Sequence, residues 1–299
     1  MPVLTLRSRW RAVLLALLGL TVLGTALQAA RAWRYQQAVA AGLQRRLADI
    51  VVAPSAAIIP CNDIAAADIP VVLAMGQSSA GNHGLSDPLH PASIPMVSLE
   101  GCLWAREPLP GATGRGGSVW SRLPAELASR KVLPPVLMSV LAVESSSIAE
   151  WTRPESPLRA RLLQHLDRMK RLGRLPTLIL WDQGAADVRD RTSSQDYRAG
   201  LLALADTVQS QAGPVRILLA PTTRCRSEAS PALHKTVAQL VATDRRFGKG
   251  PLLDQALSAD MRYDDCHLNV AGLGRAATLW ADSVHVALLS TAEPGRASP

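Results

Sequence analysis

Several features that define common protein classes are missing from this 299-residue chain. Only one apolar run is long enough to cross a bilayer, which excludes a polytopic membrane protein. Charged residues make up 19% of the chain and hydrophobic residues 48%, so long-range disorder is excluded and a sizeable core can form. The four cysteines contain no CxxC pair, and no metal-ligand spacing occurs. A zinc ribbon and a thioredoxin-like site are therefore excluded, and neither a metal nor an organic cofactor is expected.

The net charge of +8 does not indicate a nucleic-acid partner, because the positive residues are unevenly placed. Of the 32 lysines and arginines, seven lie within residues 1–50, where only one of the 24 acidic residues is found. The rest of the chain is close to neutral and has no basic excess with which to bind phosphates. We therefore expect no nucleic-acid partner.

The excess of arginine flanks the apolar run, which covers residues Ala12 to Ala30 and contains no charge. At about 1.5 Å per residue this run approaches the ~30 Å of a bilayer core. Arg7, Arg9 and Arg11 precede it, so residues 1–11 are expected to stay in the cytoplasm. The chain is then a single-pass protein of the inner membrane, with residues 31–60 as a linker and the remainder on the periplasmic side. The alternative is a signal peptide that is cleaved, followed by secretion.

Short apolar runs that end in turn residues predict buried strands, and amphipathic patterns predict the helices between them. The expected strands cover residues 69–75, 136–143, 177–181 and 215–220. The expected helices cover residues 157–172, 197–208, 231–242 and 271–289. Strands that alternate with helices favour a parallel sheet covered on both faces. We therefore expect an α/β domain over residues 61–290, a three-layer α/β/α sandwich with a flavodoxin-like sheet, and a flexible tail over residues 291–299.

Residues with hydrolytic chemistry follow the first expected strand and precede the last expected helix. Ser78 lies in a Gly-Gln-Ser turn, whereas Asp264 and His267 lie near the other end of the domain. A serine hydroxyl needs a histidine to accept its proton and an acid to orient that histidine. The Asp-x-x-His spacing lets Asp264 bond to Nδ1 of His267 and leaves Nε2 for Ser78. Asp265 is the alternative orienting acid.

These residues belong to four blocks that occur in a familiar order. The blocks are Met-Gly-Gln-Ser-Ser at 75–79, Gly-Arg-Gly-Gly-Ser-Val-Trp at 114–120, Leu-Trp-Asp-Gln-Gly-Ala-Ala-Asp at 180–187 and Asp-Asp-Cys-His at 264–267. The sequence resembles the SGNH (GDSL-like) hydrolases, and within them the sialate O-acetylesterase-like, or carbohydrate acetylesterase, branch. The resemblance runs from about residue 69 to residue 274 and implies the SGNH hydrolase fold.

The resemblance also implies the role of each residue in the blocks. Ser78 is the nucleophile, His267 the general base and Asp264 the residue that orients it. The oxyanion hole consists of the backbone N–H groups of Ser78 and Gly117, with Gly116 as an alternative glycine, and the side-chain amide of Gln183. Four further residues are weaker candidates for substrate contact: Gln77, Asn82, Trp120 and Asp187. The implied activity is that of a serine esterase that removes O-acetyl groups from a carbohydrate.

Two blocks depart from the pattern of the branch, which puts substrate orientation in doubt. Ser79 replaces the usual Asn, Ala185 replaces the usual Glu, and Asp182 stands where His is frequent. These changes leave two alternatives open: an inactive module that binds glycans, or an acyltransferase that acts on a cell-envelope polysaccharide. An α/β-hydrolase is disfavoured because its nucleophile elbow follows several strands and its acid and histidine lie far apart.

Export gives the four cysteines a role, since an even number in an oxidising compartment predicts two disulfides. Three pairings are possible. We favour Cys61–Cys102, which flank the first strand and its long loop, and Cys225–Cys266, which lie on neighbouring loops at one edge of the sheet. The other histidines are expected to be surface or capping residues: His83, His90, His165, His234 and His285.

Overall fold

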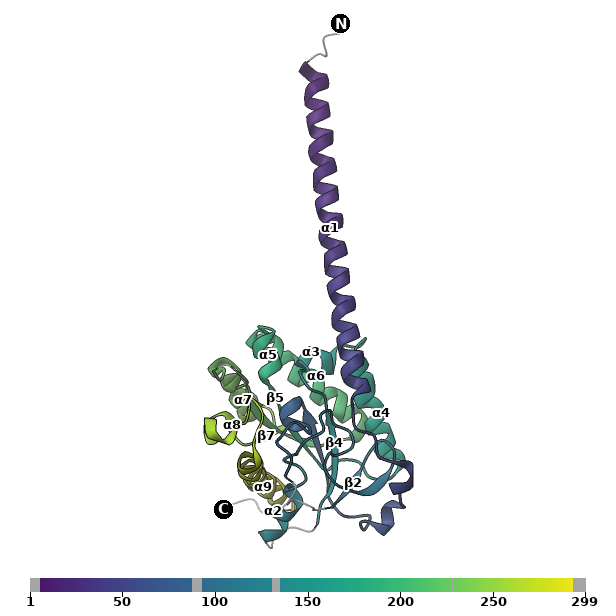
Figure 1. Cartoon of the computed structure of the whole chain (residues 1–299), viewed down its shortest axis with the longest axis vertical. Helices are drawn as coiled ribbons and strands as arrows, with labels where there is room; N and C mark the ends of the chain where they lie inside the picture. The colour runs from purple at the N-terminus through teal and green to yellow at the C-terminus, as the bar shows by residue number, and fades with distance from the viewer. Residues whose placement is uncertain (1–5, 88–92, 131–134, 227, 293–299) are drawn as a thin grey trace. The chain divides into compact units, whose positions relative to one another are not determined.

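The computed structural model describes residues 6–87, 93–130, 135–226 and 228–292 (Figure 1). The chain divides into two compact units, Met1–Arg45 and Arg46–Pro299. Some expectations lie outside the described residues: residues 1–5 of the cytoplasmic segment, His90, and residues 293–299 of the tail.

The first element is a long helix, α1 (Leu6–Ala48), which contains the apolar run at 12–30. In the described portion of the chain, we find no helix with a stretch both long and apolar enough to cross a membrane.

The described residues of the second unit form a seven-stranded sheet with the order β3-β2-β4-β1-β5-β6-β7. Its strands are β1 (Val71–Gly76), β2 (Ile94–Val97), β3 (Cys102–Ala105), β4 (Leu137–Ala142), β5 (Leu178–Gly184), β6 (Arg216–Thr222) and β7 (Phe247–Lys249). The four expected strands correspond to β1, β4, β5 and β6, and they pair in parallel. The expected parallel sheet is thus present, and the one antiparallel pair among the described strands is β2 with β3 at the edge.

The order β4-β1-β5-β6-β7 is the 2-1-3-4-5 arrangement of flavodoxin-like folds, with the β2–β3 hairpin added at one edge. The chain leaves β1 toward β4 on one side and later returns to place β5 on its other side. Such a switch point opens a crevice at the carboxyl end of the central strands. Ser78 follows β1 directly, so the fold puts it at this crevice.

Helices cover both faces of the sheet (Figure 1). They are α2 (Leu123–Ser129), α3 (Ile148–Thr152), α4 (Pro157–Arg171), α5 (Ala185–Arg189), α6 (Ser194–Ala212), α7 (Pro231–Thr243), α8 (Leu253–Ala256) and α9 (Val270–Ala292). Helices α2 and α9 contact each other, as do α3, α4 and α6, and α7 adds to α6. The expected three-layer α/β/α arrangement is therefore present.

Alternating side chains of the strands divide the core between the two faces. Val72 and Ala74 belong to the cluster that includes Trp120 and Trp280, whose rings meet edge to face at 5.4 Å. On the other face, Trp181 of β5 meets Trp151 of α3 at 5.3 Å. Fully buried tryptophans on both faces fix the sheet between its helices.

Local sequence signals explain where the longer helices begin. The side chain of Ser156 accepts a hydrogen bond from Leu158 N–H, and Pro157 occupies the first turn of α4. Ser230 and Pro231 play the same parts at α7. A serine cap followed by proline satisfies an N–H that has no partner inside the helix and presets the backbone angle.

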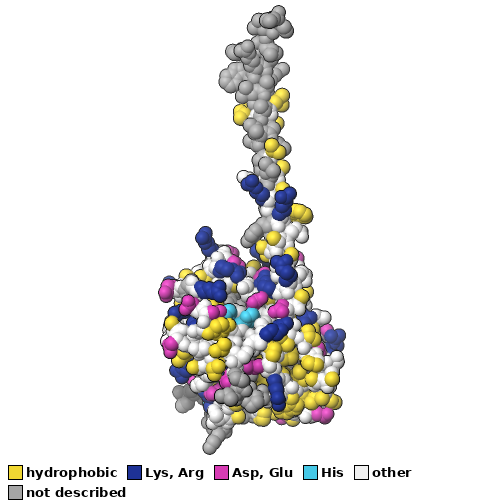
Figure 2. Space-filling model, viewed as in Figure 1, with side chains coloured by type: hydrophobic (Ala, Val, Ile, Leu, Met, Phe, Trp, Pro, Cys, Tyr) yellow, Lys and Arg dark blue, Asp and Glu magenta, His cyan; other side chains and the backbone are white. Residues whose placement is uncertain are grey.

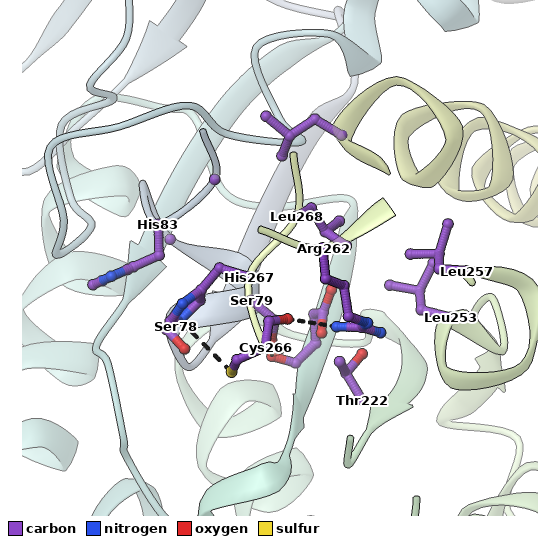
Figure 3. Close-up of a pocket in the computed structure, with 14 residues that line it drawn as sticks. Ser78, Ser79, His83, Thr222, Leu253, Leu257, Arg262, Cys266, His267 and Leu268 are labelled. Carbon is purple, nitrogen blue, oxygen red and sulfur yellow. Dashed lines mark hydrogen bonds between the residues drawn. The ribbon is translucent and has the colours of Figure 1, made fainter. Parts of the chain in front are cut away.

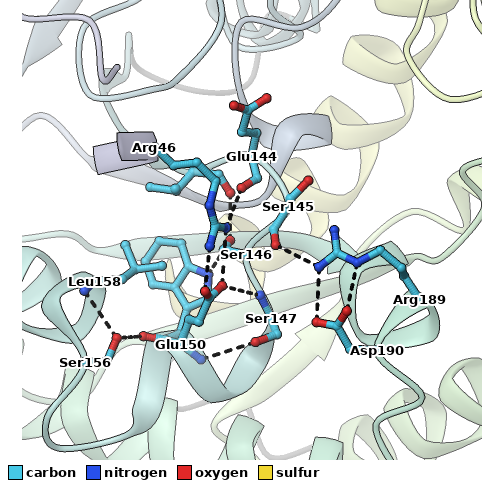
Figure 4. Close-up of polar contacts among 12 residues, drawn as sticks. Arg46, Glu144, Ser145, Ser146, Ser147, Glu150, Ser156, Leu158, Arg189 and Asp190 are labelled. Carbon is cyan, nitrogen blue, oxygen red and sulfur yellow. Dashed lines mark hydrogen bonds and ion pairs between the residues drawn. The ribbon is translucent and has the colours of Figure 1, made fainter. Parts of the chain in front are cut away.

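The segment before Cys61, expected to be a linker, packs within the second unit from Arg46 onward. Val51 exchanges backbone hydrogen bonds with the stretch Gly111–Ala112, and Ile59 N–H donates to Cys102. Arg46 forms an ion pair with Glu150 at 2.6 Å (Figure 4). The compact unit thus begins about one helical turn before the end of α1 and earlier than the expected boundary at residue 61.

Candidate active site

The turn that carries Ser78 is held by close backbone packing against β5. Gly76 has φ +147°, and a Cβ at this position would lie 2.0 Å from the carbonyl oxygen of Asp182. Only glycine fits there. Gln77, a candidate for substrate contact, instead accepts hydrogen bonds through Oε1 from the N–H groups of Gly184 and Ala186. Its buried amide joins the ends of β1 and β5.

Ser78 opens a short 3-10 turn (Ser78–Ala80) whose other residues are fastened to the core. Ser79 Oγ donates to the carbonyl oxygen of Asp182 at 3.2 Å. Trp120 Nε1 donates to the carbonyl oxygen of Ala80 at 2.7 Å and is fully buried. Trp120 therefore supports the nucleophile turn from within the core, and the structure does not place it where a sugar could stack on it.

The pairing of Asp264 with His267 has the geometry expected from the sequence. Asp264 Oδ2 lies 2.8 Å from His267 Nδ1, and Asp264 Oδ1 accepts from the backbone N–H of His267 at 2.6 Å. Asp265 makes no side-chain hydrogen bond among the described residues and has φ +62°. The carboxylate that contacts the imidazole is thus that of Asp264.

The same contacts explain the charge state of Asp264. Burial acts to raise its pKa, but hydrogen bonds from His267 and Cys266 outweigh burial and hold the pKa below the ordinary value. A carboxylate that stays ionised keeps the Nδ1 hydrogen in place and leaves Nε2 of neutral His267 free to accept a proton.

Ser78 and His267 line the same small cavity at the carboxyl end of β1, and Figure 3 shows them side by side. No hydrogen bond joins Ser78 Oγ to His267 within the described residues, and His267 Nε2 lies 3.9 Å from Cys266 Sγ. Such contacts often tighten only when substrate binds. The ring of His267 is about one-fifth exposed, and histidine side chains reach the surface on the face drawn in Figure 2.

The inner wall of this cavity is partly charged. Asp182, Thr222 and Arg262 line it together with leucines of α8 and α9. Burial raises the pKa of Asp182 to about 6, and the side chains of Thr222, Ser79 and Trp280 offset this effect only in part. Burial also lowers the pKa of Arg262. Its Nη1 donates to the carbonyl oxygen of Cys266, and its Nη2 lies 4.0 Å from Asp254 Oδ1.

Two disulfides with the favoured pairing are present. Cys61–Cys102 has a Cα–Cα distance of 5.1 Å, and Cys225–Cys266 one of 4.1 Å. The second bond joins the loop after β6 to the loop between Asp264 and His267. A covalent bond at Cys266 therefore restrains the backbone next to the general base.

Neither a protein-family profile nor a curated protein sequence matches the chain. A solved structure from Arabidopsis thaliana, the protein AT4G34215, is similar with a TM-score of 0.54 and 19% identity, over 74% of this chain and 98% of that one. A Clostridium thermocellum family 3 carbohydrate esterase is similar with a TM-score of 0.50 and 12% identity, over 76% of this chain and 100% of that one.

The protein has the SGNH hydrolase fold. Identities this low establish the fold alone, and the sialate-specific branch is not shown. The described residues contain no group of three or more His, Cys, Asp or Glu side chains that could hold a metal ion.

Two of the three oxyanion donors expected for the SGNH site are engaged elsewhere. Gln183 is fully buried, and its Nε2 donates both to Ser146 O at 3.0 Å and to the Asp187 carboxylate. Gly117 N–H donates to Gly84 O, and the alternative, Gly116 N–H, donates to Asn82 O. The structure therefore does not bring Gln183, Gly117 or Gly116 to the reacting centre, although it leaves the backbone N–H of Ser78 without a protein acceptor in the described chain.

The glycine that the sequence analysis missed in this block is Gly114. Its N–H has no acceptor among the residues described, and its φ is +89°. A Cβ on Gly114 would lie 2.4 Å from Asn82 O and 2.8 Å from Cδ2 of His83, so this backbone packs against His83, which lines the cavity together with Ser78. Nothing in the sequence distinguishes Gly114 from Gly116 and Gly117.

The remaining candidates for substrate contact are structural. The amide of Asn82 is fully buried and bonds to the backbone of Leu109 and Ala112. The carboxylate of Asp187 accepts hydrogen bonds from Ile148 N–H, Thr192 Oγ1 and Gln183 Nε2. These bonds join the loops that follow β4 and β5. Burial raises the pKa of Asp187 despite these donors. Neither residue lines the cavity beside Ser78.

His83 and Tyr263 lie at the site, although the sequence analysis treated His83 as a surface or capping residue. The ring of His83 stacks on that of His267 at 5.3 Å between centroids, and the ring of Tyr263 lies 6.1 Å from it. The only hint in the sequence is position, since His83 follows the nucleophile by five residues and Tyr263 adjoins Asp264.

Proposed function

We propose that this protein is a serine esterase that hydrolyses short acyl esters, acetyl esters above all, on a carbohydrate. The observation that carries the proposal is the Asp264–His267 contact of 2.8 Å on a loop whose histidine lines one cavity with Ser78. The cavity beside Ser78 is small, which favours an acetyl group over longer acyl chains. The carbohydrate is supported by the name of the Clostridium thermocellum neighbour, a carbohydrate esterase.

The chemistry follows from the roles of the three side chains. His267 Nε2 takes the proton of Ser78 Oγ while Oγ bonds to the ester carbonyl carbon. The negative charge on the carbonyl oxygen is stabilised by the N–H groups of Ser78 and Gly114, which we propose as donors in place of Gly117 and Gln183. The bond to the sugar oxygen then breaks, and that oxygen receives the proton from Nε2. Water, deprotonated by His267, releases acetate and restores Ser78.

The experiment is a pair of serine variants of the full chain, assayed with 4-nitrophenyl acetate and with O-acetylated polysaccharides. Ser78→Ala should lower kcat by ~10³-fold or more. Ser79→Ala is the matched control, because its hydroxyl contacts Asp182 and has no hydrogen bond to His267 among the described residues, and it should retain activity within about fivefold. A Ser78→Ala variant with more than about a tenth of the wild-type rate would show that Ser78 is not the nucleophile. An inactive wild type would favour a module that only binds glycans. Transfer of the acetyl group to an added acceptor sugar, in place of release of acetate, would show an acyltransferase.

The two disulfides support action outside the cytoplasm, because disulfides persist in oxidising compartments. We propose the periplasmic side of the inner membrane, with residues 12–30 as the anchor. Membrane fractionation and N-terminal sequencing of the exported protein test this location. A soluble product that begins after residue 26 would show cleavage and secretion instead.

A further inference from the structure

His267 has fewer fixed contacts on its ring than its role requires. Nδ1 bonds to Asp264, but the one hydrogen-bond contact of Nε2 within the described residues is the long one with Cys266 Sγ at 3.9 Å. The ring turns about its Cβ–Cγ bond, and among the described residues the Nδ1 hydrogen bond to Asp264 is the one strong polar contact that restrains this rotation. The ring plane must therefore be held by packing, and two aromatic rings contact it: His83, inclined by 25°, and Tyr263, inclined by 29°.

The contact with His83 is built from fixed groups. His83 Nε2 lies 3.1 Å from Thr113 Oγ1, and Thr113 is fully buried. Thr113 Oγ1 already accepts a hydrogen bond from Glu144 N–H at 2.8 Å, so its own hydrogen is available to Nε2. Tyr263 hydroxyl donates to the carbonyl oxygen of His83 at 3.0 Å, which ties the two neighbouring residues together.

The charge of His83 also suits a neighbour of the general base. Burial, and next the like charge of His267, lower the pKa of His83 to about 4. Asp49 and Asp264 act in the opposite direction, and Arg115 in the same direction as burial. Glu144 Oε2 lies 3.8 Å from Nε2 but is more exposed. A neutral ring adds no positive charge against the imidazolium that forms when His267 accepts a proton.

We propose that His83 is a positioning residue whose ring, tethered to Thr113 and joined by Tyr263, holds the His267 imidazole so that Nε2 faces Ser78. This inference rests on the proposed esterase function. A small displacement of a catalytic group lowers the rate by up to ~10²-fold while it leaves substrate affinity unchanged. The effect should therefore lie in kcat and not in KM.

The test compares two variants of the full chain that differ in whether a ring is present. His83→Ala removes the ring and should lower kcat by ~10- to 100-fold, with KM within about threefold of wild type. His83→Phe restores the ring without nitrogen atoms and should bring kcat back to within about fivefold. If the alanine variant does not fold, His83→Leu takes its place, with the same direction of change. An unchanged kcat in the ringless variant, a change in KM alone, or an equal loss in the phenylalanine variant would overturn the proposal.

A second measurement does not depend on turnover. The ring nitrogen shifts of His267 in ¹⁵N NMR should show a hydrogen on Nδ1 of the wild type and mobile, averaged values in the ringless variant. Identical shifts in the two proteins would overturn the positioning role even if no ester is hydrolysed. An inactive wild type with altered shifts in the variant would instead count against the esterase function alone.

Discussion

Asp264 and Asp265 are adjacent in the sequence, and their backbone conformations decide which of the two carboxylates orients His267. Asp264 bonds to the ring and backbone of His267, whereas the chain turns through a positive φ at Asp265 and carries that side chain away. The spacing Asp-x-x-His was enough to predict Asp264, because a three-residue separation lets a short acidic side chain fold back onto the imidazole.

Asp264→Asn should lower kcat by ~10²- to 10⁴-fold, since an amide at this position no longer stabilises the imidazolium or fixes the tautomer. Asp265→Asn is the matched control and should stay within about threefold of wild type. Steady-state rates with 4-nitrophenyl acetate measure both. The reverse result would make Asp265 the orienting acid.

The depressed pKa of Asp264 sets the sign of its effect on stability. The folded protein binds this proton less tightly than the unfolded chain does. The stabilisation is therefore complete above the ordinary aspartate pKa near 4 and is lost as pH falls through the lower folded value.

The resemblance implies that Gln183 donates to the oxyanion, but in the structure its side chain forms other hydrogen bonds. Its amide joins Ser146 and Asp187, and Tyr197 hydroxyl donates to its Oε1 at 2.9 Å. Gln183→Ala should therefore destabilise the fold by about 2 kcal/mol, because Asp187 and Tyr197 lose buried partners, while kcat of the folded enzyme changes less than fivefold. Thermal melting and kinetics separate the two effects, with Gln211→Ala, at a partly exposed position near the end of α6, as control. A ~10²-fold loss of kcat at unchanged stability would restore the oxyanion role.

At the scale of elements, the strands and helices that cross the core were predictable from the sequence because their apolar patterns are long. The predicted strand at 69–75 and the helix at 157–172 each fall within two residues of β1 and α4. The strands β2, β3 and β7 were missed because they have only three or four residues, too few for a period to show. The short helices α3 and α5 were missed for the same reason, and both depend on tertiary contacts.

The two disulfides close loops of the same length, with a sequence separation of 41 between the cysteines in each case. Chain entropy therefore predicts a similar loss of stability for each removal, about 4 kcal/mol in the simplest treatment. Their positions differ, because only Cys225–Cys266 adjoins His267. The double variant Cys225→Ser with Cys266→Ser should lose more than tenfold in kcat, whereas Cys61→Ser with Cys102→Ser should lose stability alone.

Kinetics measured well below the melting temperature of each double variant distinguish these outcomes. Equal losses of kcat in both variants would show that the second disulfide has no special part in holding the His267 loop. Mild reduction of the wild-type protein should likewise reduce the rate before the core unfolds.

At the scale of the whole molecule, the buried carboxyl of Asp182 in β5 makes the free energy of unfolding depend on pH. The pKa of Asp182 is raised from 3.8 to about 6. The folded state thus holds this proton more tightly than the unfolded chain, so its contribution is complete below about pH 4 and is lost as pH rises through about 6. The loss amounts to about 3 kcal/mol, since each pKa unit corresponds to ~1.4 kcal/mol.

Asp182→Asn keeps the shape of the side chain without its charge, so its stability relative to wild type should increase by about 3 kcal/mol between pH 4 and pH 8. Denaturant unfolding at the two values measures the change. Asp167→Asn, on the exposed side of α4, is the control and should show no such increase. A pH-independent difference for Asp182→Asn would show that Asp182 is ionised in both states.

The nucleophile follows the first strand of the folded unit, and the base precedes its last helix. A ribosome therefore synthesises Ser78 189 positions before His267, and the Cys225–Cys266 disulfide can form only after Cys266 has been made as well. Under the proposed function, a growing chain that ends before His267 lacks the general base. The proposed esterase would therefore be inactive until this late part of the folded unit has been made.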